Sequence, residues 1–179
     1  MTESGQSKQI DELYQLIERI KVAMLTTRRS DGRLVSRPMA TQKREPIADL
    51  WFVTDIESHA PRELEHDPHV NLAYLDGDSW EWVSVSGTAR ISTDRARIRA
   101  LYRPDWKAWF GAVDNVRDGG PDDPRFALIL VDADSVTYLK RDKSTPMVLF
   151  EVAKGLVTGQ RPEIGEVRTV DPLPRRRTA

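Results

Sequence analysis

The side chains with the clearest potential for chemistry lie in one polar turn. Its members are Thr54, Asp55, Ser58 and His59. An apolar strand predicted at 50–53 leads into the turn, and a short helix should follow it as far as Asp67-Pro68, because proline disfavours helical geometry in the preceding residue. The first N–H groups of a helix lack partners and lie at its positive dipole end, so the turn suits an anion such as phosphate. A capped helix that binds nothing is the simpler interpretation of this turn taken alone.

Two further groups of residues extend this candidate site. Arg37 lies in a predicted strand that Pro38 interrupts, and an arginine can make paired, charge-assisted hydrogen bonds to a phosphate. Trp106, Trp109 and Phe110 fall at i, i+3 and i+4 of a predicted helix, so they share one face. They would cover a flat aromatic ring if another subunit or a folded-back helix delivers them. The alternative is that Arg37 is a surface charge and the tryptophans belong to the core.

Other chemistries lack their sequence motifs. The chain has no cysteine, which excludes disulfides, thiolate nucleophiles and cysteine metal ligands. Its three histidines, at 59, 66 and 69, match no usual zinc spacing, so no metal site is predicted. A serine in a Gly-x-Ser-x-Gly elbow, a phosphate-binding P-loop and a Gly-x-Gly-x-x-Gly fingerprint are all missing from the sequence. Hydrolase and Rossmann-type functions are therefore without support.

The composition of the chain argues against two classes of binding partner, nucleic acid and membrane. A formal net charge of −1 gives no global attraction to nucleic acid. No run of residues approaches the roughly 20 apolar residues of a membrane span, and the first residues lack the pattern of a secretory signal. We therefore expect no specific nucleic-acid partner, no membrane insertion and a cytoplasmic location.

The elements around the candidate site are predicted to form an antiparallel barrel of six or seven strands with peripheral helices. Short spacings and turn signals such as Asp31-Gly32 favour hairpin-linked strands over βαβ units. Pro38 implies an edge strand, a bulge or a special site, and Gly87 implies a bulge or the close approach of another backbone. The predicted strands are 22–27, 33–41, 50–53, 70–75, 80–91, 126–139 and about 146–152. The predicted helices cover 10–20, the turns after residue 58, the segment following Ser92-Thr93-Asp94, and the segment from Pro104.

Several segments, in this order, resemble one known family. They are Met24-Leu25-Thr26-Thr27, Ser36-Arg37-Pro38-Met39, Leu50-Trp51-Phe52-Val53-Thr54-Asp55, Asp67-Pro68-His69-Val70-Asn71-Leu72, Val83-Ser84-Val85-Ser86-Gly87, and Lys107-Ala108-Trp109-Phe110 followed by Gly120-Pro121-Asp122-Asp123-Pro124. The set is similar to the FMN-binding general stress proteins of the pyridoxamine 5′-phosphate oxidase-like, split-barrel superfamily. The resemblance implies an FMN-binding split-barrel domain at residues 8–155, followed by an extended C-terminal arm at 156–179. It also implies a homodimer with FMN in a groove between two barrels.

The same resemblance assigns roles to individual residues. Arg37, Pro38 and Met39 match the strand that passes the flavin and sends an arginine to the phosphate. Val53 and Thr54 match the next strand, which contacts the edge of the isoalloxazine ring, and Asp55 closes that motif. Ser58 and His59 match the turn on the phosphate side. Trp109 matches an aromatic residue that lies near the flavin of the partner subunit.

Two departures from the family keep alternatives open. Relatives commonly have Ser-x-Lys in the phosphate turn, and Ala60 stands at the lysine position. The substrate-phosphate residues of true pyridoxamine-phosphate oxidases have no clear match, so the small-molecule substrate is unassigned. The alternatives to a redox flavoprotein of general stress type are a true pyridoxamine 5′-phosphate oxidase, a deazaflavin-dependent reductase, and a non-catalytic binding or sensor module.

Overall fold

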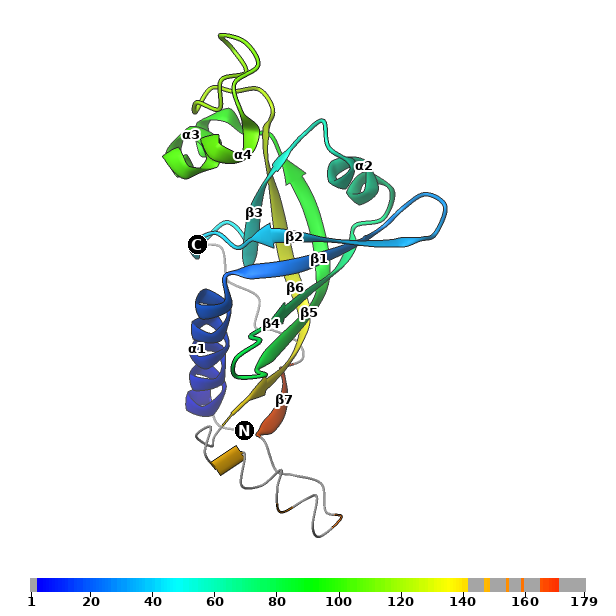
Figure 1. Cartoon of the computed structure of the whole chain (residues 1–179), viewed down its shortest axis with the longest axis vertical. Coiled ribbons are helices and arrows are strands. Elements are labelled where there is room, and N and C mark those ends of the chain that lie inside the picture. Colours follow the sequence, from blue (N-terminus) through cyan, green and yellow to red (C-terminus); the bar gives the residue numbers. More distant parts are fainter. Residues whose placement is uncertain (1–2, 142–146, 149–153, 155–158, 160–164, 171–179) are drawn as a thin grey trace.

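The computed structural model describes residues 3–141, 147–148, 154, 159 and 165–170. Seven strands form one antiparallel sheet in the order β2-β1-β4-β5-β6-β3, and β7 pairs with the second half of β6. The sheet is strongly curved, and α1 runs along one side of it (Figure 1). The strands are β1 (Val22–Arg28), β2 (Leu34–Ala40), β3 (Leu50–Asp55), β4 (His69–Leu75), β5 (Trp82–Ser92), β6 (Phe126–Lys140) and β7 (Glu166–Val170).

The sheet does not close into a complete barrel. β2 and β3 are the two ends of the strand order, and among the described residues each pairs with a strand along one side only. They approach each other just after β2, where the N–H of Gln42 donates to the carbonyl of Trp51 at 3.1 Å. This arrangement confirms the predicted split barrel, and it confirms that Pro38 lies in an edge strand, where a missing N–H does not break a ladder.

Burial along the strands explains how the sheet separates two cores. In β1, β4 and β5 buried residues alternate with more exposed ones, so one face of each strand lines the barrel interior. The first six residues of β6 are all buried, because they pack against the interior on one side and against helices on the other. The outer core contains Ala48, Trp51, Ile98, Trp106, Phe126, Leu128 and Leu130.

The helices cover the barrel at three places. They are α1 (Glu3–Ile20), α2 (His59–His66), α3 (Arg95–Leu101), the 3₁₀ turn η1 (Pro104–Trp106) and α4 (Lys107–Phe110). Leu13, Leu16 and Ile17 place α1 in the inner core, and Leu64 does the same for α2. α3, η1 and α4 cover the outer core, and α2 ends before Asp67-Pro68 as predicted. None of the helices among the described residues has the length and apolar character to cross a membrane.

Two glycine signals are confirmed. Gly32 has a φ of 84° in the tight turn between β1 and β2. At Gly87 the pairing of β5 with β6 shifts register, and a Cβ atom there would lie 2.3 Å from the carbonyl oxygen of Asp132. Only glycine permits such an approach of two backbones. The bulge and the close contact predicted for Gly87 are thus both present.

The C-terminal part differs from the sequence expectation. The strand predicted at about 146–152 lies largely outside the described residues, and the two described ones, Met147 and Val148, are helical rather than extended. The seventh strand is instead β7, which belongs to the segment predicted as an arm. It pairs with β6 and places Val170 in the inner core. The division into residues 8–155 and 156–179 stays a prediction.

Candidate functional site

A groove of about 490 Å³ follows the split between β2 and β3. Its volume lies in the range of small-molecule and cofactor sites. Six of the residues predicted to contact a cofactor line it, namely Pro38, Met39, Val53, Thr54, Asp55 and Trp109. Val22, Ala40, Gln42, Asp105, Trp106 and Phe110 complete the lining. Three predicted contacts are not among the lining residues. Arg37 lies on β2, and Ser58 and His59 lie in the turn between β3 and α2.

The edge strand β2 forms one wall. Its side chains alternate, so Pro38 and Ala40 point to the outer face of the sheet, whereas Arg37 and Met39 are half-buried on the inner face. Met39 reaches the groove from the inner face, and Arg37 lies two residues away, about 7 Å along the strand. The structure therefore places Arg37 beside the groove rather than in its lining.

The end of β3 forms the opposite wall and leads into α2. The Ser58 hydroxyl donates to the carbonyl of Asp55 at 2.6 Å and lies 3.3 Å from the Thr54 hydroxyl. Ser58 precedes α2, yet its side chain makes no capping hydrogen bond to that helix. The Ser58 side chain therefore does not cap α2, as the simple capped-helix interpretation would require, because its hydroxyl points back toward β3.

The residues after Ser58 differ in exposure. His59 is exposed at the start of α2, whereas Ala60 is 2% exposed and packs in the inner core. A lysine at position 60 would have to start from within that core. The other histidines are exposed, and His69 contacts Asp67 at 2.7 Å. Within the described ranges no cluster of three or more histidine, aspartate or glutamate side chains has the geometry to hold a metal ion.

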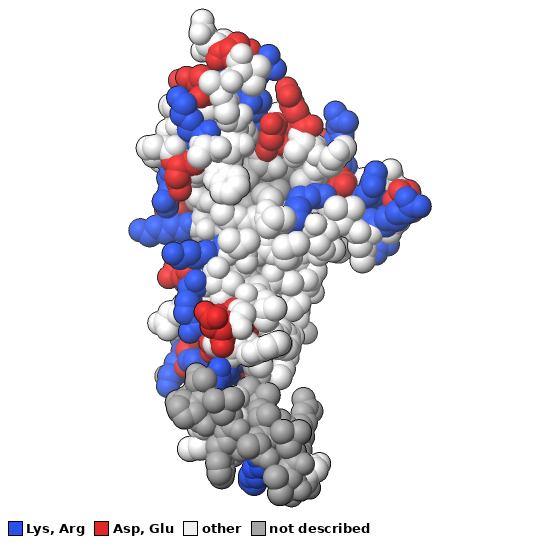
Figure 2. Space-filling model, viewed as in Figure 1, with Lys and Arg blue, Asp and Glu red and all other residues white. Residues whose placement is uncertain are grey.

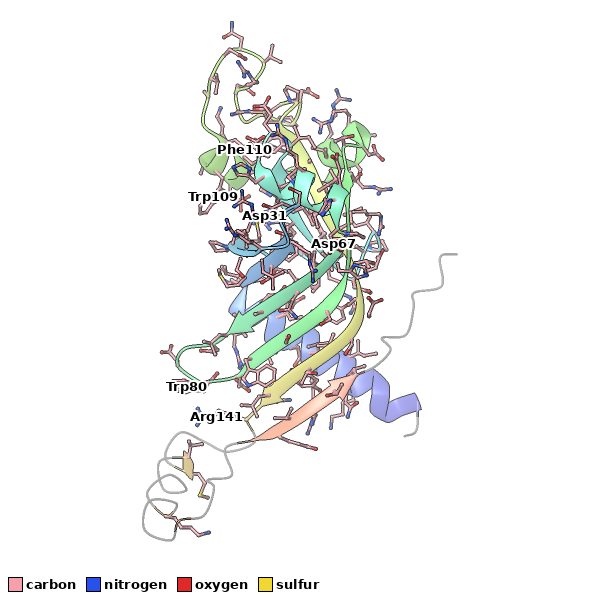
Figure 3. The ribbon with its side chains drawn as sticks, turned by 90° about the vertical axis from the view of Figure 1, so that its right-hand side faces the viewer. Asp31, Asp67, Trp80, Trp109, Phe110 and Arg141 are labelled. Carbon is pink, nitrogen blue, oxygen red and sulfur yellow. The ribbon has the colours of Figure 1, made fainter. Side chains whose placement is uncertain are left out.

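The aromatic wall comes from η1 and α4. Trp106 is 3% exposed, meets Trp51 edge-on with ring centroids 6.2 Å apart, and donates from Nε1 to Oε1 of Gln42 at 3.2 Å. Trp109 is 85% exposed and extends from α4 on the side that faces the viewer in Figure 1, as the turned view shows (Figure 3). Each of the two alternatives for the tryptophans holds for one of them: Trp106 packs in the outer core, and Trp109 is exposed and able to cover a ligand.

A buried ion pair that the sequence reasoning missed holds α4 in place. Arg125 donates to both carboxylate oxygens of Asp123 and also to the carbonyls of Phe110 and Gly111, at 2.9 Å each. Asp123 is fully buried, and its hydrogen bonds from Arg125 lower its pKa to about 2. Charged residues placed directly before the apolar run of β6 were the available signal. The pair fixes the C-terminal end of the segment that carries Trp109.

A second pair that the sequence reasoning missed engages Arg37. One guanidinium nitrogen, Nη2, donates to Oε2 of Glu63 on α2 at 2.5 Å, and the Thr27 hydroxyl donates to the same oxygen at 2.5 Å. The other terminal nitrogen, Nη1, is buried and has no hydrogen-bond partner within the part of the chain that the structure describes. Burial raises the pKa of Glu63, but hydrogen bonds from Thr27 and Arg37 and the charges of Arg37 and Arg29 outweigh it, so its pKa lies below the ordinary value. Glu63 is therefore ionised at neutral pH.

The outer face of β2, β1 and β4 continues from the groove and carries no charge at its centre. Val22 and Met24 are 47% and 40% exposed there, beside Pro38, Ala40 and Ala73. Figure 2 shows this region white, with the charged side chains gathered at its margins. Exposed, contiguous apolar surface of this kind marks an interaction site more often than a free surface.

Fold and site together define a split-barrel protein with a ligand-sized groove between its two edge strands. The chain belongs to the pyridoxamine 5′-phosphate oxidase-like family, whose sequence profile it matches over residues 8–163. It is 38% identical over 172 residues to Protein bli-3 of Neurospora crassa, an alignment that covers 94% of this chain and 82% of that protein.

Solved structures support the same placement. A provisionally assigned general stress protein 26 of Jannaschia sp. CCS1 is similar with a TM-score of 0.69 and 26% identity, over 92% of this chain and 99% of that one. The general stress FMN/FAD binding protein of Xanthomonas citri has a TM-score of 0.61 and 25% identity, over 77% of this chain and 92% of that one. The resemblance found in the sequence, and the fold that it implied, are thereby confirmed.

Proposed function

We propose that this chain is a homodimeric flavoprotein of general stress type that binds FMN in the split groove. The observation that carries the proposal is the meeting of three separate segments, 38–39, 53–55 and 109, in one groove of cofactor size. Each of these segments matches a cofactor-binding part of the family pattern. The Xanthomonas citri relative is described as an FMN/FAD binding protein, which supports a flavin as the occupant.

The groove suits a flat ring with a polar edge. β2 and β3 each leave one side of the backbone unpaired, and such edges present N–H and C=O groups. Those groups match the alternating donors and acceptors at the edge of an isoalloxazine ring. Pro38, Met39 and Val53 give apolar contact to its faces, and the free indole of Trp109 is placed to stack on it.

The phosphate is assigned to the β2–α2 end of the groove. Arg37 has a buried N–H donor there that lacks an acceptor, and a buried donor without a partner costs on the order of 1–3 kcal/mol. A phosphate oxygen would satisfy it. The hydroxyl of Ser58 and the exposed ring of His59 stand at the start of α2, whose first N–H groups attract anions.

The uncharged outer face is assigned to the contact with a second copy of the chain. The groove opens onto this face, because Val22, Pro38 and Ala40 belong to both. A partner seated on it would close the groove from outside. Bound FMN supplies hydride or electron transfer, and the chain contributes orientation of the ring and exclusion of water.

The test of the flavin assignment is an absorbance spectrum of the purified protein, followed by titration of FMN into any apo fraction. We expect flavin bands, or binding in the micromolar range or tighter with quenching of tryptophan fluorescence. The variant Trp109→Ala should keep the fold and lose part of that quenching, since Trp106 also lines the groove, while Trp80→Ala, which replaces an exposed tryptophan outside the groove, should not reduce it. Absence of both flavin bands and micromolar binding would overturn the proposal.

A panel of cofactors separates the related functions. FMN, FAD, riboflavin and a deazaflavin are titrated in parallel, and each complex is assayed with pyridoxamine 5′-phosphate and with artificial electron acceptors. Turnover of pyridoxamine 5′-phosphate would assign a true oxidase, and selective deazaflavin binding would assign the reductase class. FMN binding with redox cycling but without vitamin B6 turnover is the expected result.

A further inference from the structure

The pair formed by Arg37 and Glu63 sets the charge at the phosphate end of the groove. Both side chains are largely withdrawn from solvent, with 21% of Arg37 and 10% of Glu63 exposed. Their Nη2 and Oε2 atoms lie 2.5 Å apart, and the Thr27 hydroxyl holds the same carboxylate oxygen from β1. The carboxylate is therefore fixed beside the cation and neutralises it.

Few other cations compensate for this. Ala60 is buried at the position where relatives commonly have a lysine. Arg29 lies near enough to lower the pKa of Glu63 through its charge, but Arg29 and Arg62 are both exposed, where solvent screens their charge. The opposite charges of Arg37 and Glu63 thus cancel, and one N–H donor of Arg37 has no acceptor among the described residues.

We infer that Glu63 limits the affinity of this protein for the flavin phosphate, so that FMN binds as an exchangeable cofactor with at most a modest preference over riboflavin. The inference rests on the proposed function, since it requires a flavin in the groove with its phosphate at Arg37. A phosphate dianion gains one hydrogen bond from Nη1, but it also approaches the Glu63 carboxylate. At such distances the repulsion between like charges is comparable with the attraction to Arg37, because protein screens both similarly.

The decisive variant is Glu63→Gln. A glutamine has nearly the same shape, and its side-chain oxygen can still accept from Thr27 and Arg37, so Arg37 stays in place while the negative charge is removed. We expect FMN to bind at least about fivefold more tightly and riboflavin to change by less than about twofold. The control is Glu65→Gln, which removes the same charge from the exposed face of α2 and should leave both affinities unchanged.

The two ligands make the outcomes distinct. If neither FMN nor riboflavin binds the wild-type protein, the proposed function fails and this inference with it. If both bind, and Glu63→Gln leaves FMN affinity unchanged or weakens it, the inference alone is overturned, and Glu63 serves to position Arg37. The wild-type protein gives a measurement that needs no variant to fold: its affinities for FMN and riboflavin should differ by no more than about thirtyfold, which corresponds to about 2 kcal/mol. A larger preference for FMN contradicts the inference.

Discussion

The two terminal nitrogens of Arg37 have different roles, because one is held by an acidic side chain and the other has no acceptor within the described ranges. Nη2 is engaged by Glu63, and Nη1 is the buried donor that remains. A lysine has all its donors on one nitrogen, so it could not assign a separate nitrogen to each direction as the planar fork of the guanidinium does. The local chemistry at this position therefore depends on residues 26 positions apart in the sequence.

Replacing Arg37 with alanine removes the proposed phosphate contact and leaves the Glu63 carboxylate without its cation. We expect FMN affinity to fall by about 1.5–3 kcal/mol, the scale of a hydrogen bond to a charged group. Riboflavin affinity should hold within about twofold, so that the preference for FMN over riboflavin falls or is reversed. Isothermal titration with both ligands measures this, and equal losses for both would show that Arg37 supports the fold instead.

Asp123 makes the free energy of unfolding depend on pH in the acidic range. Its hydrogen bonds from Arg125 lower the pKa to about 2, below the ordinary value of 3.8. A carboxyl group with a depressed folded-state pKa contributes stability that is complete above the unfolded pKa and is lost as pH falls through the folded one. We expect the free energy of unfolding to fall by on the order of 2 kcal/mol between about pH 4 and pH 2 from this group.

Urea unfolding at several values of pH in that window checks the expectation. The variant Asp114→Asn is the control, since Asp114 has a similarly lowered pKa but lies in an exposed pair with Arg117. It should retain most of the dependence on pH. A flat profile in the wild-type protein would contradict the assignment.

At the scale of elements, α4 is a single turn whose position depends on a distant side chain. Arg125 reaches the carbonyls that end α4, and the Phe110 ring packs on Phe126 with centroids 4.3 Å apart. A four-residue helix has too few internal hydrogen bonds to persist alone. The aromatic wall is therefore built by β6 as much as by α4.

The variant Arg125→Lys keeps the charge but cannot reach Asp123 and two carbonyls together. We expect the protein to lose about 1–3 kcal/mol of stability and to bind FMN more weakly, because Trp109 is no longer held over the groove. Denaturant unfolding and flavin titration measure the two effects. Arg117→Lys, which alters an exposed pair, should change stability by less than about 0.5 kcal/mol. Unaltered flavin binding in Arg125→Lys would separate α4 from the site.

Elements with local signals were predictable from the sequence, and pairings between distant segments were not. Asp31-Gly32, Gly87, Pro38 and Asp67-Pro68 each carry a backbone restriction that acts within a few residues, and each lies where that restriction predicts. The contacts of Arg37 with Glu63 depend instead on how α2 packs against β1 and β5. No periodicity encodes that packing. β7 was missed for the same reason, since its pairing partner lies in β6, about 30 residues earlier.

At the scale of the whole molecule, the uncharged outer face predicts association of two copies. Met24 lies in the interior of this face, between Pro38 on β2 and Ala73 on β4. A glutamate at position 24 would bury an unpaired charge in the interface, which costs several kcal/mol. We expect wild-type protein to be a dimer by light scattering and Met24→Glu to be a monomer with weakened flavin binding.

Val167→Glu is the matched control for the dimer. Val167 is also exposed but lies on β7, beyond β6 at the far side of the sheet. Its replacement should leave the dimer intact. A wild-type monomer, or a dimer that Met24→Glu does not affect, would rule out this face as the contact.

The open seam between β2 and β3 also has a consequence for the abundance of the protein in a cell. A ligand that bridges the two edges completes the barrel wall, and it stabilises the native state by about 2.7 kcal/mol when its concentration is 100 times the dissociation constant. A change of 1–2 kcal/mol in stability alters steady-state abundance several-fold through proteolysis of the unfolded chain. If the groove holds an exchangeable flavin, the amount of this protein should rise and fall with the supply of riboflavin, even when the rate of protein synthesis stays the same.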